Sequence, residues 1–276
     1  MAKSYETVLV DVKDGVAKVT LNRPDKRNAM NPQLHRDMYA ALKEVKYDPE
    51  VRVLVLTGSG NSWSAGQDLK EYFYDLRDKP YEWEEIRLIS NSWMTVELRN
   101  FPKPTIAAVN GYVFGAGFIP LIACDLAVTV AEAKFGLSEI NFGLIPAGMV
   151  TRMLMDVVGQ RNCMYYILTG RPFDGRIAEK IGLVNKCVDT MDELWAEVDD
   201  IANELKGKHP AALQLSKELY LKSCMMSYEQ AYDYSITKVA QLTQMENAEW
   251  YDEGIMRFKK GEFRPGLEHY DRGKNA

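Results

Sequence analysis

The sequence predicts an α/β fold in which parallel strands alternate with crossover helices. Short apolar runs of strand length recur along the chain, segments with helical spacing of apolar residues separate them, and no stretch is rich in hairpins. With 276 residues, 46% of them hydrophobic, the chain is long enough to bury a core without covalent or metal cross-links.

The first elements are two strands followed by a helix. Residues 7–21 alternate apolar and polar side chains on either side of an Asp14-Gly15 turn, which predicts two antiparallel strands. Asn31-Pro32 then opens a helix, with proline in its first turn. Its apolar stripe consists of Leu34, Met38, Ala41, Leu42 and Val45.

Three apolar runs predict buried parallel strands, namely residues 51–57, Thr105 to Val109 and Leu126 to Val130. Residues 69–100 are charged and aromatic, and we expect a loop followed by a helix. From about residue 190 the chain becomes helical and more charged, with one helix starting at Met191. We therefore expect a core over residues 1–200 and a helical C-terminal region over residues 201–276.

Charge and composition exclude two classes of partner. The chain has 34 lysines and arginines against 39 acidic residues, a net charge of −5, which argues against nucleic-acid binding. The twenty residues from Thr105 to Cys124 carry no charge, but their asparagine, glycines and Pro120 favour a buried strand, a glycine loop and a helix over a membrane span.

The cysteines and histidines predict neither disulfides nor a metal site. No two of the four cysteines have C-x-x-C spacing, and the three histidines are far apart in sequence. The N-terminus lacks the apolar segment of a signal peptide. We expect a cytoplasmic protein whose cysteines are buried free thiols.

Three motifs follow predicted strands or lie close to them. They are Ser64-Ala65-Gly66-Gln67-Asp68-Leu69, then Asn110-Gly111-Tyr112-Val113-Phe114-Gly115-Ala116-Gly117, then Phe135-Gly136-Leu137-Ser138-Glu139-Ile140-Asn141-Phe142-Gly143. The second does not fit a dinucleotide fingerprint, because Pro120 stands where the third glycine belongs, and it is no P-loop. Taken singly, glycines in such motifs are typical of close backbone packing. Taken singly, Glu139 is typical of a partly exposed carboxylate without a catalytic role.

Taken together, the motifs predict enolate chemistry on a thioester or similar carbonyl. Two glycine-rich strand exits can direct two backbone N–H groups at one point, which makes an oxyanion hole. A carboxylate in apolar surroundings has a raised pKa and can act as a general acid or base.

With these motifs the sequence resembles the crotonase, or enoyl-CoA hydratase/isomerase, superfamily over nearly its whole length. Within it the chain is most similar to the hydroxycinnamoyl-CoA (feruloyl-CoA) hydratase-lyases. Further segments that carry the resemblance are Leu21-Asn22-Arg23-Pro24, Lys26-Arg27-Asn28-Ala29-Met30, Asp68-Leu69-Lys70-Glu71-Tyr72-Phe73, Leu168-Thr169-Gly170-Arg171 and Gly182-Leu183-Val184-Asn185.

The resemblance implies a crotonase fold, with repeated ββα turns forming a spiral core and a C-terminal helical region that makes trimers or pairs of trimers. It implies an acyl-CoA thioester as substrate, no permanently bound cofactor and no metal. The oxyanion donors would be the backbone N–H groups of Gln67 and Ala116, with Glu139 as the acid–base residue. Lys26 would lie near the CoA phosphates, and Ala65 and Leu69 along the adenine and pantetheine path. The other substrate-binding positions that it implies are Asp68, Tyr72, Ile119, Ser138, Phe142, Tyr232 and Ile236.

The sequence departs from the superfamily pattern at two of these positions. Ile119 stands where typical enoyl-CoA hydratases carry the first of two glutamates, and where hydratase-lyases usually carry serine. Tyr72 matches one of two phenol-binding tyrosines, but Ile236 occupies the place of the second. Tyr232 lies four residues before Ile236, on the same face of the predicted helix. It either replaces the missing second tyrosine or packs at a subunit contact.

These features predict a hydratase or hydratase-lyase that acts on an aryl- or cyclic-enoyl-CoA such as hydroxycinnamoyl-CoA. A single-glutamate enoyl-CoA isomerase is the alternative. A non-catalytic CoA-binding or RNA-binding relative is a third interpretation, against which the intact glycine loops and Glu139 argue.

Overall fold

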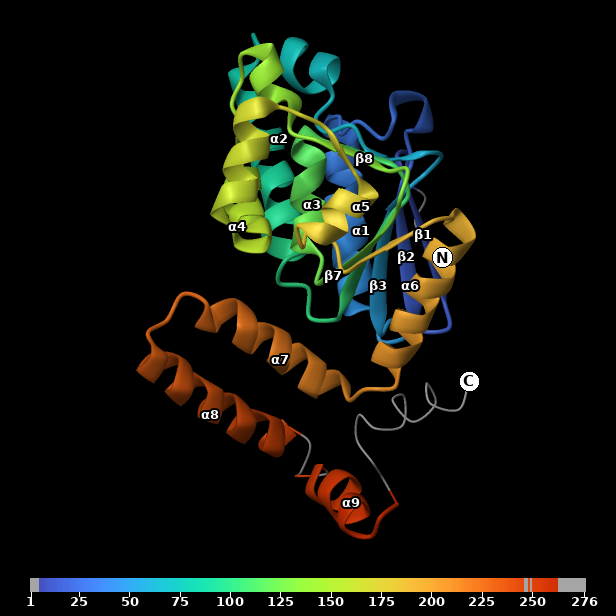
Figure 1. The fold of residues 1–276 in the computed structure, drawn as a ribbon, viewed down its shortest axis with the longest axis vertical. Coiled ribbons are helices and arrows are strands. Elements are labelled where there is room, and N and C mark those ends of the chain that lie inside the picture. The colour runs from blue at the N-terminus through green and yellow to red at the C-terminus, as the bar shows by residue number, and fades with distance from the viewer. Residues whose placement is uncertain (1–4, 246–247, 249, 263–276) are drawn as a thin grey trace. The chain divides into compact units, whose positions relative to one another are not determined.

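The computed structural model describes residues 5–245, 248 and 250–262. The chain forms two compact units, Met1–Lys208 and His209–Ala276. The first contains two β-sheets and the helices α1 to α6, and the second contains α7 to α9 (Figure 1). The predicted α/β class is therefore confirmed.

A six-stranded sheet forms the centre of the first unit, in the order β1-β2-β3-β5-β7-β10. β1 and β2 are antiparallel, and every other neighbouring pair is parallel. The predicted hairpin and the three predicted buried strands all lie in this sheet. The strands are β1 (Val8–Lys13), β2 (Val16–Leu21), β3 (Val53–Gly58), β5 (Thr105–Val109), β7 (Leu126–Val130) and β10 (Lys186–Val188).

A second sheet of short strands has the order β4-β6-β8-β9. Its strands are β4 (Ser62–Ser64), β6 (Tyr112–Phe114), β8 (Lys134–Gly136) and β9 (Phe173–Asp174). The first three run parallel, and β9 pairs antiparallel with β8.

Strands of the two sheets alternate along the chain, which produces the predicted ββα repeat. Each turn contributes one strand to the large sheet, one to the small sheet and then a helix, as in β3-β4-α2, β5-β6-α3 and β7-β8-α4. Successive turns are neighbours in both sheets, so the chain winds as a spiral. The loops that leave β4, β6 and β8 therefore emerge next to one another.

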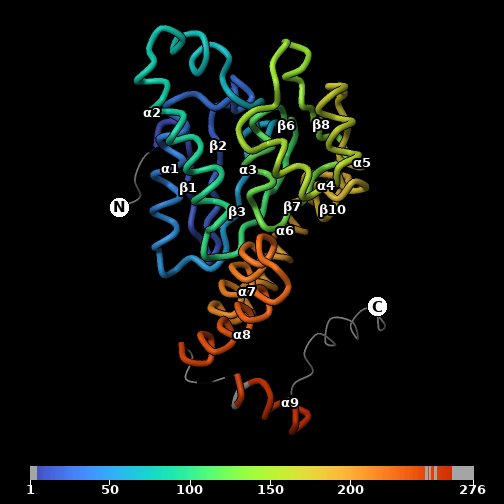
Figure 2. The backbone as a smooth tube through the Cα atoms, turned by 90° about the vertical axis from the view of Figure 1, so that its left-hand side faces the viewer, coloured from blue at the N-terminus to red at the C-terminus, as the bar shows by residue number. Residues whose placement is uncertain are grey.

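Capping residues in the sequence mark the start of helices in the first unit. The Asn31 side chain accepts the Leu34 N–H at the start of α1, and a Thr190–Glu193 capping box opens α6. α1 and α2 lie side by side (Figure 2). The helices are α1 (Pro32–Tyr47), α2 (Pro80–Asn91), α3 (Phe118–Ala123), α4 (Val150–Thr169), α5 (Gly175–Lys180) and α6 (Met191–Lys206).

The uncharged segment from Thr105 to Cys124 is part of the core, as predicted. It forms β5, β6 and α3, and its apolar side chains pack in one cluster with Trp63, Trp93 and Phe135. Within the described residues, no helix combines the length and the apolar character needed to cross a membrane. Cys124, Cys163 and Cys187 are buried thiols as expected, whereas Cys224 is an exposed one.

The second unit is helical, with α7 (Pro210–Ser223), α8 (Tyr228–Met245) and α9 (Arg257–Lys259). Pro210 stands in the first turn of α7. The Glu218 carboxylate joins α7 to α8, because it accepts hydrogen bonds from the Tyr234 hydroxyl and the Lys238 ammonium, both at 2.8 Å. Residues 263–276 of the predicted C-terminal region lie outside the described residues.

Close backbone packing at Gly111 generates a stability prediction. A Cβ atom at Gly111 would lie 1.9 Å from the Asn61 carbonyl oxygen, so β4 and β6 would have to separate. We expect Gly111→Ala to lower the free energy of unfolding by about 1–3 kcal/mol, as overpacking does. Thermal denaturation measures this, with Gly254→Ala as the control, since a Cβ there meets no other atom within 4 Å. Equal melting temperatures for the two variants would contradict the prediction.

Candidate functional site

The candidate site lies where three parallel strands of the small sheet end. Gln67 follows β4, Ala116 follows β6 and Glu139 follows β8. Because β4 pairs with β6 and β6 with β8, these three residues leave the sheet at the same edge. In open α/β sheets, ligands bind outside the carboxyl ends of parallel strands.

The backbone N–H of Gln67 points away from the segment that precedes α1. Met30 and Gln67 form a parallel β-bridge, in which the Met30 N–H donates to Gly66 O at 2.8 Å and Asp68 N–H donates to Met30 O at 3.0 Å. In this pattern the residue at the centre of the bridge directs its own N–H to the opposite side. For Gln67 that is the side of β6.

The backbone N–H of Ala116 lies close to the Gly66–Gln67 peptide. A Cβ atom at Gly66 would stand 3.2 Å from Ala116 N and 2.7 Å from Phe114 O. Gly66 also has a φ of +88°, which favours glycine. Ala116 is the second residue of a 3₁₀ turn, Gly115–Gly117, so its N–H has no partner inside that turn. Two backbone donors from different loops are thus brought together.

The Glu139 carboxylate approaches the same loop. A Cβ atom at Gly115 would lie 3.2 Å from Glu139 Oε1, so only glycine leaves the carboxylate this room. Its Oε2 is buried, with no hydrogen-bond partner among the described residues. Burial raises the pKa of Glu139 above its ordinary value. A carboxylate of this kind can carry a proton in general acid–base chemistry.

A partly buried ion-pair network fixes the loop that follows β4. The Arg23 guanidinium contacts the carboxylates of Asp68 at 2.9 Å and Glu71 at 2.7 Å, and also donates to Ala29 O at 2.6 Å. The other oxygen of Asp68 accepts the N–H groups of Lys70 and Glu71. These charged hydrogen bonds lower the pKa of Asp68 despite its burial. Asp68 therefore holds the loop in shape, and its contact with substrate stays a prediction.

The residues predicted to follow the CoA chain lie on adjacent segments. Ala65 is half-buried, and its N–H donates to Arg27 O at 2.9 Å, which brings it beside the turn that carries Lys26. Lys26 and Leu69 are exposed. Ala65, Leu69 and Lys26 are therefore all at least partly accessible. They lie on two adjacent segments, one after β4 and one before α1.

The other predicted positions have varied surroundings. Ile119 is buried in α3, and a Cβ atom at Gly148 would lie 3.3 Å from its Cδ1, so Ile119 faces the loop beyond Glu139. Ser138 is half-buried and Phe142 is exposed, both on the 3₁₀ turn Ser138–Phe142 that carries Glu139. Tyr72 is buried on the π-helical turn Leu69–Tyr74.

Tyr232 and Ile236 lie on α8 of the second unit. Both side chains are exposed, and they are four residues apart on one helix face. Their predicted contacts with the acyl group stay predictions.

A buried polar cluster that was not predicted from the sequence lies behind Gln67. His35 Nε2 lies 2.7 Å from Gln67 Oε1, and the Trp93 indole N–H donates to His35 Nδ1 at 2.9 Å. Gln67 Nε2 in turn donates to Ser90 Oγ at 3.4 Å. The signal available in the sequence was the position of His35 beside Leu34 and one turn before Met38, on the apolar face of α1.

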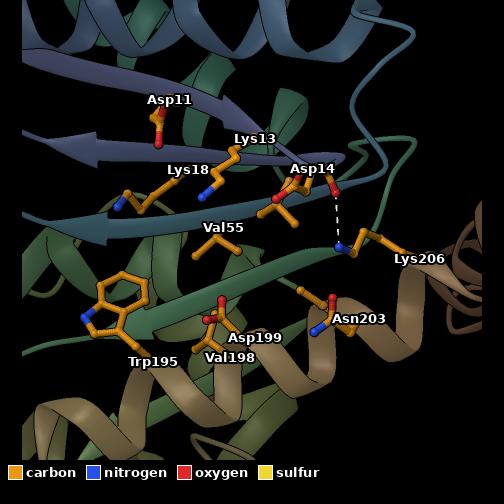
Figure 3. A pocket seen from close by; sticks show the side chains of 12 residues that line it. Asp11, Lys13, Asp14, Lys18, Val55, Trp195, Val198, Asp199, Asn203 and Lys206 are labelled. Carbon is orange, nitrogen blue, oxygen red and sulfur yellow. Dashed lines mark hydrogen bonds between the residues drawn. The ribbon is translucent and has the colours of Figure 1, made fainter.

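A separate cavity of about 520 Å³ lies between the large sheet and α6 (Figure 3). Asp11, Asp14 and Asp199 and Lys13, Lys18 and Lys206 line it with opposite charges. The Lys18 ammonium lies 5.3 Å from the centre of the Trp195 ring, and Lys206 donates to Asp14 O at 3.1 Å. None of the predicted site residues lines this cavity.

Comparison with known proteins identifies the family. The family described as enoyl-CoA hydratase/isomerase matches residues 11–264. The hydroxycinnamoyl-CoA hydratase-lyase of Pseudomonas fluorescens is 42% identical over 270 residues, which cover 97% of this chain and 98% of that protein. The short-chain-enoyl-CoA hydratase of Clostridium acetobutylicum is 33% identical over 212 residues, 76% of this chain and 79% of that protein.

A solved structure agrees with these relatives. An enoyl-CoA hydratase of Mycobacterium smegmatis superposes with a TM-score of 0.85 at 29% identity, covering 92% of this chain and 96% of its own. The family and the crotonase fold predicted from the sequence motifs are thus confirmed. The chain belongs to the enoyl-CoA hydratase/isomerase family.

Proposed function

We propose that this protein is a hydratase-lyase that acts on an aryl-enoyl-CoA thioester of the hydroxycinnamoyl type. The observation that carries the proposal is the buried, unpartnered Glu139 Oε2, with the same carboxylate set against Gly115 next to the N–H of Ala116. The name and full-length similarity of the Pseudomonas fluorescens relative support the choice of substrate.

In the hydration step, the thioester oxygen accepts hydrogen bonds from the backbone N–H groups of Gln67 and Ala116. Glu139 takes a proton from water as the water oxygen bonds to the β-carbon, and the double-bond electrons move toward the thioester to form an enolate. Glu139 then returns the proton to the α-carbon. Preorganised donors stabilise the charge that develops on the oxygen.

In the lyase step, the β-hydroxyl proton returns to Glu139 and the bond between the α- and β-carbons breaks. The β-carbon leaves as an aldehyde, and the two electrons form the enolate of acetyl-CoA, which the same proton quenches. One carboxylate is sufficient for both steps, since it alternates between base and acid. The oxyanion donors serve both steps unchanged.

The CoA portion and the acyl group are held by different segments in this proposal. Lys26 supplies a cation for the CoA phosphates, and Ala65 and Leu69 line the path beside it; one local cation allows an acidic protein to hold an anionic substrate. Tyr72, Ile119, Ser138 and Phe142 surround the acyl group, with Tyr72 facing a ring oxygen. The acyl-group contacts predicted for Tyr232 and Ile236 of α8 stay predictions. No permanently bound cofactor or metal takes part.

An enoyl-CoA isomerase is the second candidate function. The observation that favours it is the buried, apolar Ile119, which stands where typical hydratases of this superfamily carry the first of their two glutamates. In that reaction Glu139 moves one proton between carbons of the acyl chain, and no water adds.

We also propose that the protein is a cytoplasmic homo-oligomer, a trimer or a pair of trimers. The support is a run of exposed apolar side chains around the Glu139 turn, which a neighbouring subunit would cover. These side chains are Ile140, Phe142, Leu144, Ile145 and Met149. Sedimentation analysis of the purified protein measures the subunit number.

The reaction type is tested by mass analysis of products from a panel of enoyl-CoA thioesters. We expect 4-hydroxycinnamoyl-CoA to yield an aryl aldehyde and acetyl-CoA. A gain of water without cleavage indicates a hydratase, and an unchanged mass with a shifted double bond indicates an isomerase. Either result contradicts the proposed lyase step.

Replacing Glu139 by glutamine tests the acid–base role. Glu139→Gln keeps the shape of the side chain and removes the proton carrier, so we expect kcat to fall by about 10²–10⁴-fold with little change in thioester affinity. In the unchanged enzyme, kcat/KM should fall as the pH drops through the raised pKa of Glu139, because the base becomes protonated. Turnover of Glu139→Gln within a few-fold of the unchanged enzyme would refute this role.

Two substitutions at Ala116 test the backbone donor. Ala116→Gly offers the same N–H and should stay active. Ala116→Val places a branched side chain beside the thioester and should lower kcat by about 10²–10³-fold, as the loss of one oxyanion donor does. Circular dichroism verifies that both variants fold. A folded but inactive Ala116→Gly would contradict a role for the N–H.

A further inference from the structure

The side chain of Gln67 is anchored by hydrogen bonds at both ends of its amide. Its Oε1 lies 2.7 Å from Nε2 of His35 on α1, and its Nε2 donates to Oγ of Ser90 on α2 at 3.4 Å. His35 is held in turn by Trp93, whose indole N–H donates to His35 Nδ1 at 2.9 Å. His35, Trp93 and Ser90 are all buried. The loop after β4 is therefore tied to two helices through polar side chains.

The direction of the hydrogen bonds at His35 follows from what each group can donate. An indole N–H is only a donor, so Nδ1 of His35 is the unprotonated nitrogen of the ring. The proton of the neutral imidazole is then on Nε2, which donates it to Gln67 Oε1. Complete burial lowers the pKa of His35 to about 4, which agrees with a neutral ring at neutral pH. One protonation state of His35 thus satisfies both of its partners.

The peptide that carries the Gln67 N–H begins at a glycine. Its carbonyl oxygen is that of Gly66, which accepts the Met30 N–H at 2.8 Å. Gly66 has a φ of +88° and no side chain that could hold its end of the peptide. The C=O and N–H of a trans peptide point in opposite directions, so any tilt of this peptide also turns the N–H. Of the two residues that share the peptide, only Gln67 has a side chain to oppose such a tilt.

We propose that His35 is a positioning residue of the oxyanion hole: supported by Trp93, it holds the Gln67 side chain and thereby directs the backbone N–H of Gln67 at the thioester oxygen. This inference rests on the proposed function, which assigns that N–H to the oxygen. A backbone donor cannot adjust its direction by a change of rotamer, so its aim depends on how firmly its peptide is held. Oxyanion donors stabilise the developing charge because they are preorganised.

The stretching frequency of a bound thioester carbonyl reports on the oxyanion hole, because hydrogen bonds to the oxygen weaken the C=O bond. A saturated 3-arylpropanoyl-CoA thioester lacks the double bond and binds without turnover. An isotopic label at its carbonyl carbon identifies its band in an infrared difference spectrum. In the unchanged protein we expect a lower frequency than in the free ligand. Binding without any lowering would refute the proposed oxyanion hole, and this inference with it.

His35→Leu removes both ring nitrogens and leaves the Gln67 amide without its partner on α1. We expect the carbonyl frequency of the bound ligand to move toward the free value and kcat to fall by about 10²-fold, as a misplaced catalytic group causes. The affinity for the saturated ligand should stay nearly unchanged, since the CoA portion keeps its contacts. His35→Gln supplies one donor and one acceptor and should restore the frequency and kcat.

Leu42→Ala is the matched control for loosening of the core. Leu42 is buried two turns further along the same face of α1, so its truncation leaves a cavity and should lower the melting temperature. Its carbonyl frequency and kcat should equal those of the unchanged protein. If His35→Leu likewise changes only the melting temperature, His35 merely fills space and the inference is overturned. Equal frequency shifts in both variants would overturn it too.

Gln67→Leu tests the same contact from its other side, and serves should His35→Leu not fold. It keeps the backbone N–H and removes the amide, so we expect the carbonyl frequency and kcat to change as in His35→Leu. In the double variant kcat should fall no further, because two residues that act through one contact are not additive. An unchanged frequency in Gln67→Leu, or losses that multiply in the double variant, would overturn the inference while leaving the oxyanion hole in place.

Discussion

The parallel pairing of three short strands, β4, β6 and β8, is the constraint on which the candidate site depends. Each is three residues long and contributes little stability alone, yet their register decides which loop residues meet. Gln67, Ala116 and Glu139 are separated by 23 residues or more in the sequence and have no local reason to be neighbours. The spiral of ββα turns places them together because it stacks equivalent positions of successive turns.

The large sheet and the ion pairs around Arg23 support this arrangement from outside. The large sheet fixes β3, β5 and β7 side by side, so the short strands that follow them have little choice of neighbour. Arg23 then joins the segment before α1 to the loop after β4 through Asp68 and Glu71. A partly buried guanidinium between two carboxylates is worth more than an exposed pair, because less solvent screens it. The resulting rigidity suits a site built from backbone donors, which cannot adjust by changing rotamer.

The sequence was sufficient for elements whose signal is local. Thr105–Val109 and Leu126–Val130 are strands with the predicted bounds. In each, four of five residues are apolar, and a short apolar run between turn residues is typical of a buried strand. The short strands could not be predicted in this way, because three residues carry no readable period and their partners are far away. The glycine motifs did indicate where the site lies. The contacts of His35 were out of reach, since its partners Gln67 and Trp93 are 32 and 58 residues away.

Glu139 Oε2, which is buried without a hydrogen-bond partner among the described residues, also affects how this protein responds to selection for stability. A buried polar atom without a partner costs about 1–3 kcal/mol relative to a satisfied one, and more if it is charged. A methionine or leucine at this position would remove that cost, so repeated selection for heat resistance alone would favour such replacements. Libraries of this protein screened only by thermal tolerance will therefore drift toward well-folded sequences that lack the carboxylate.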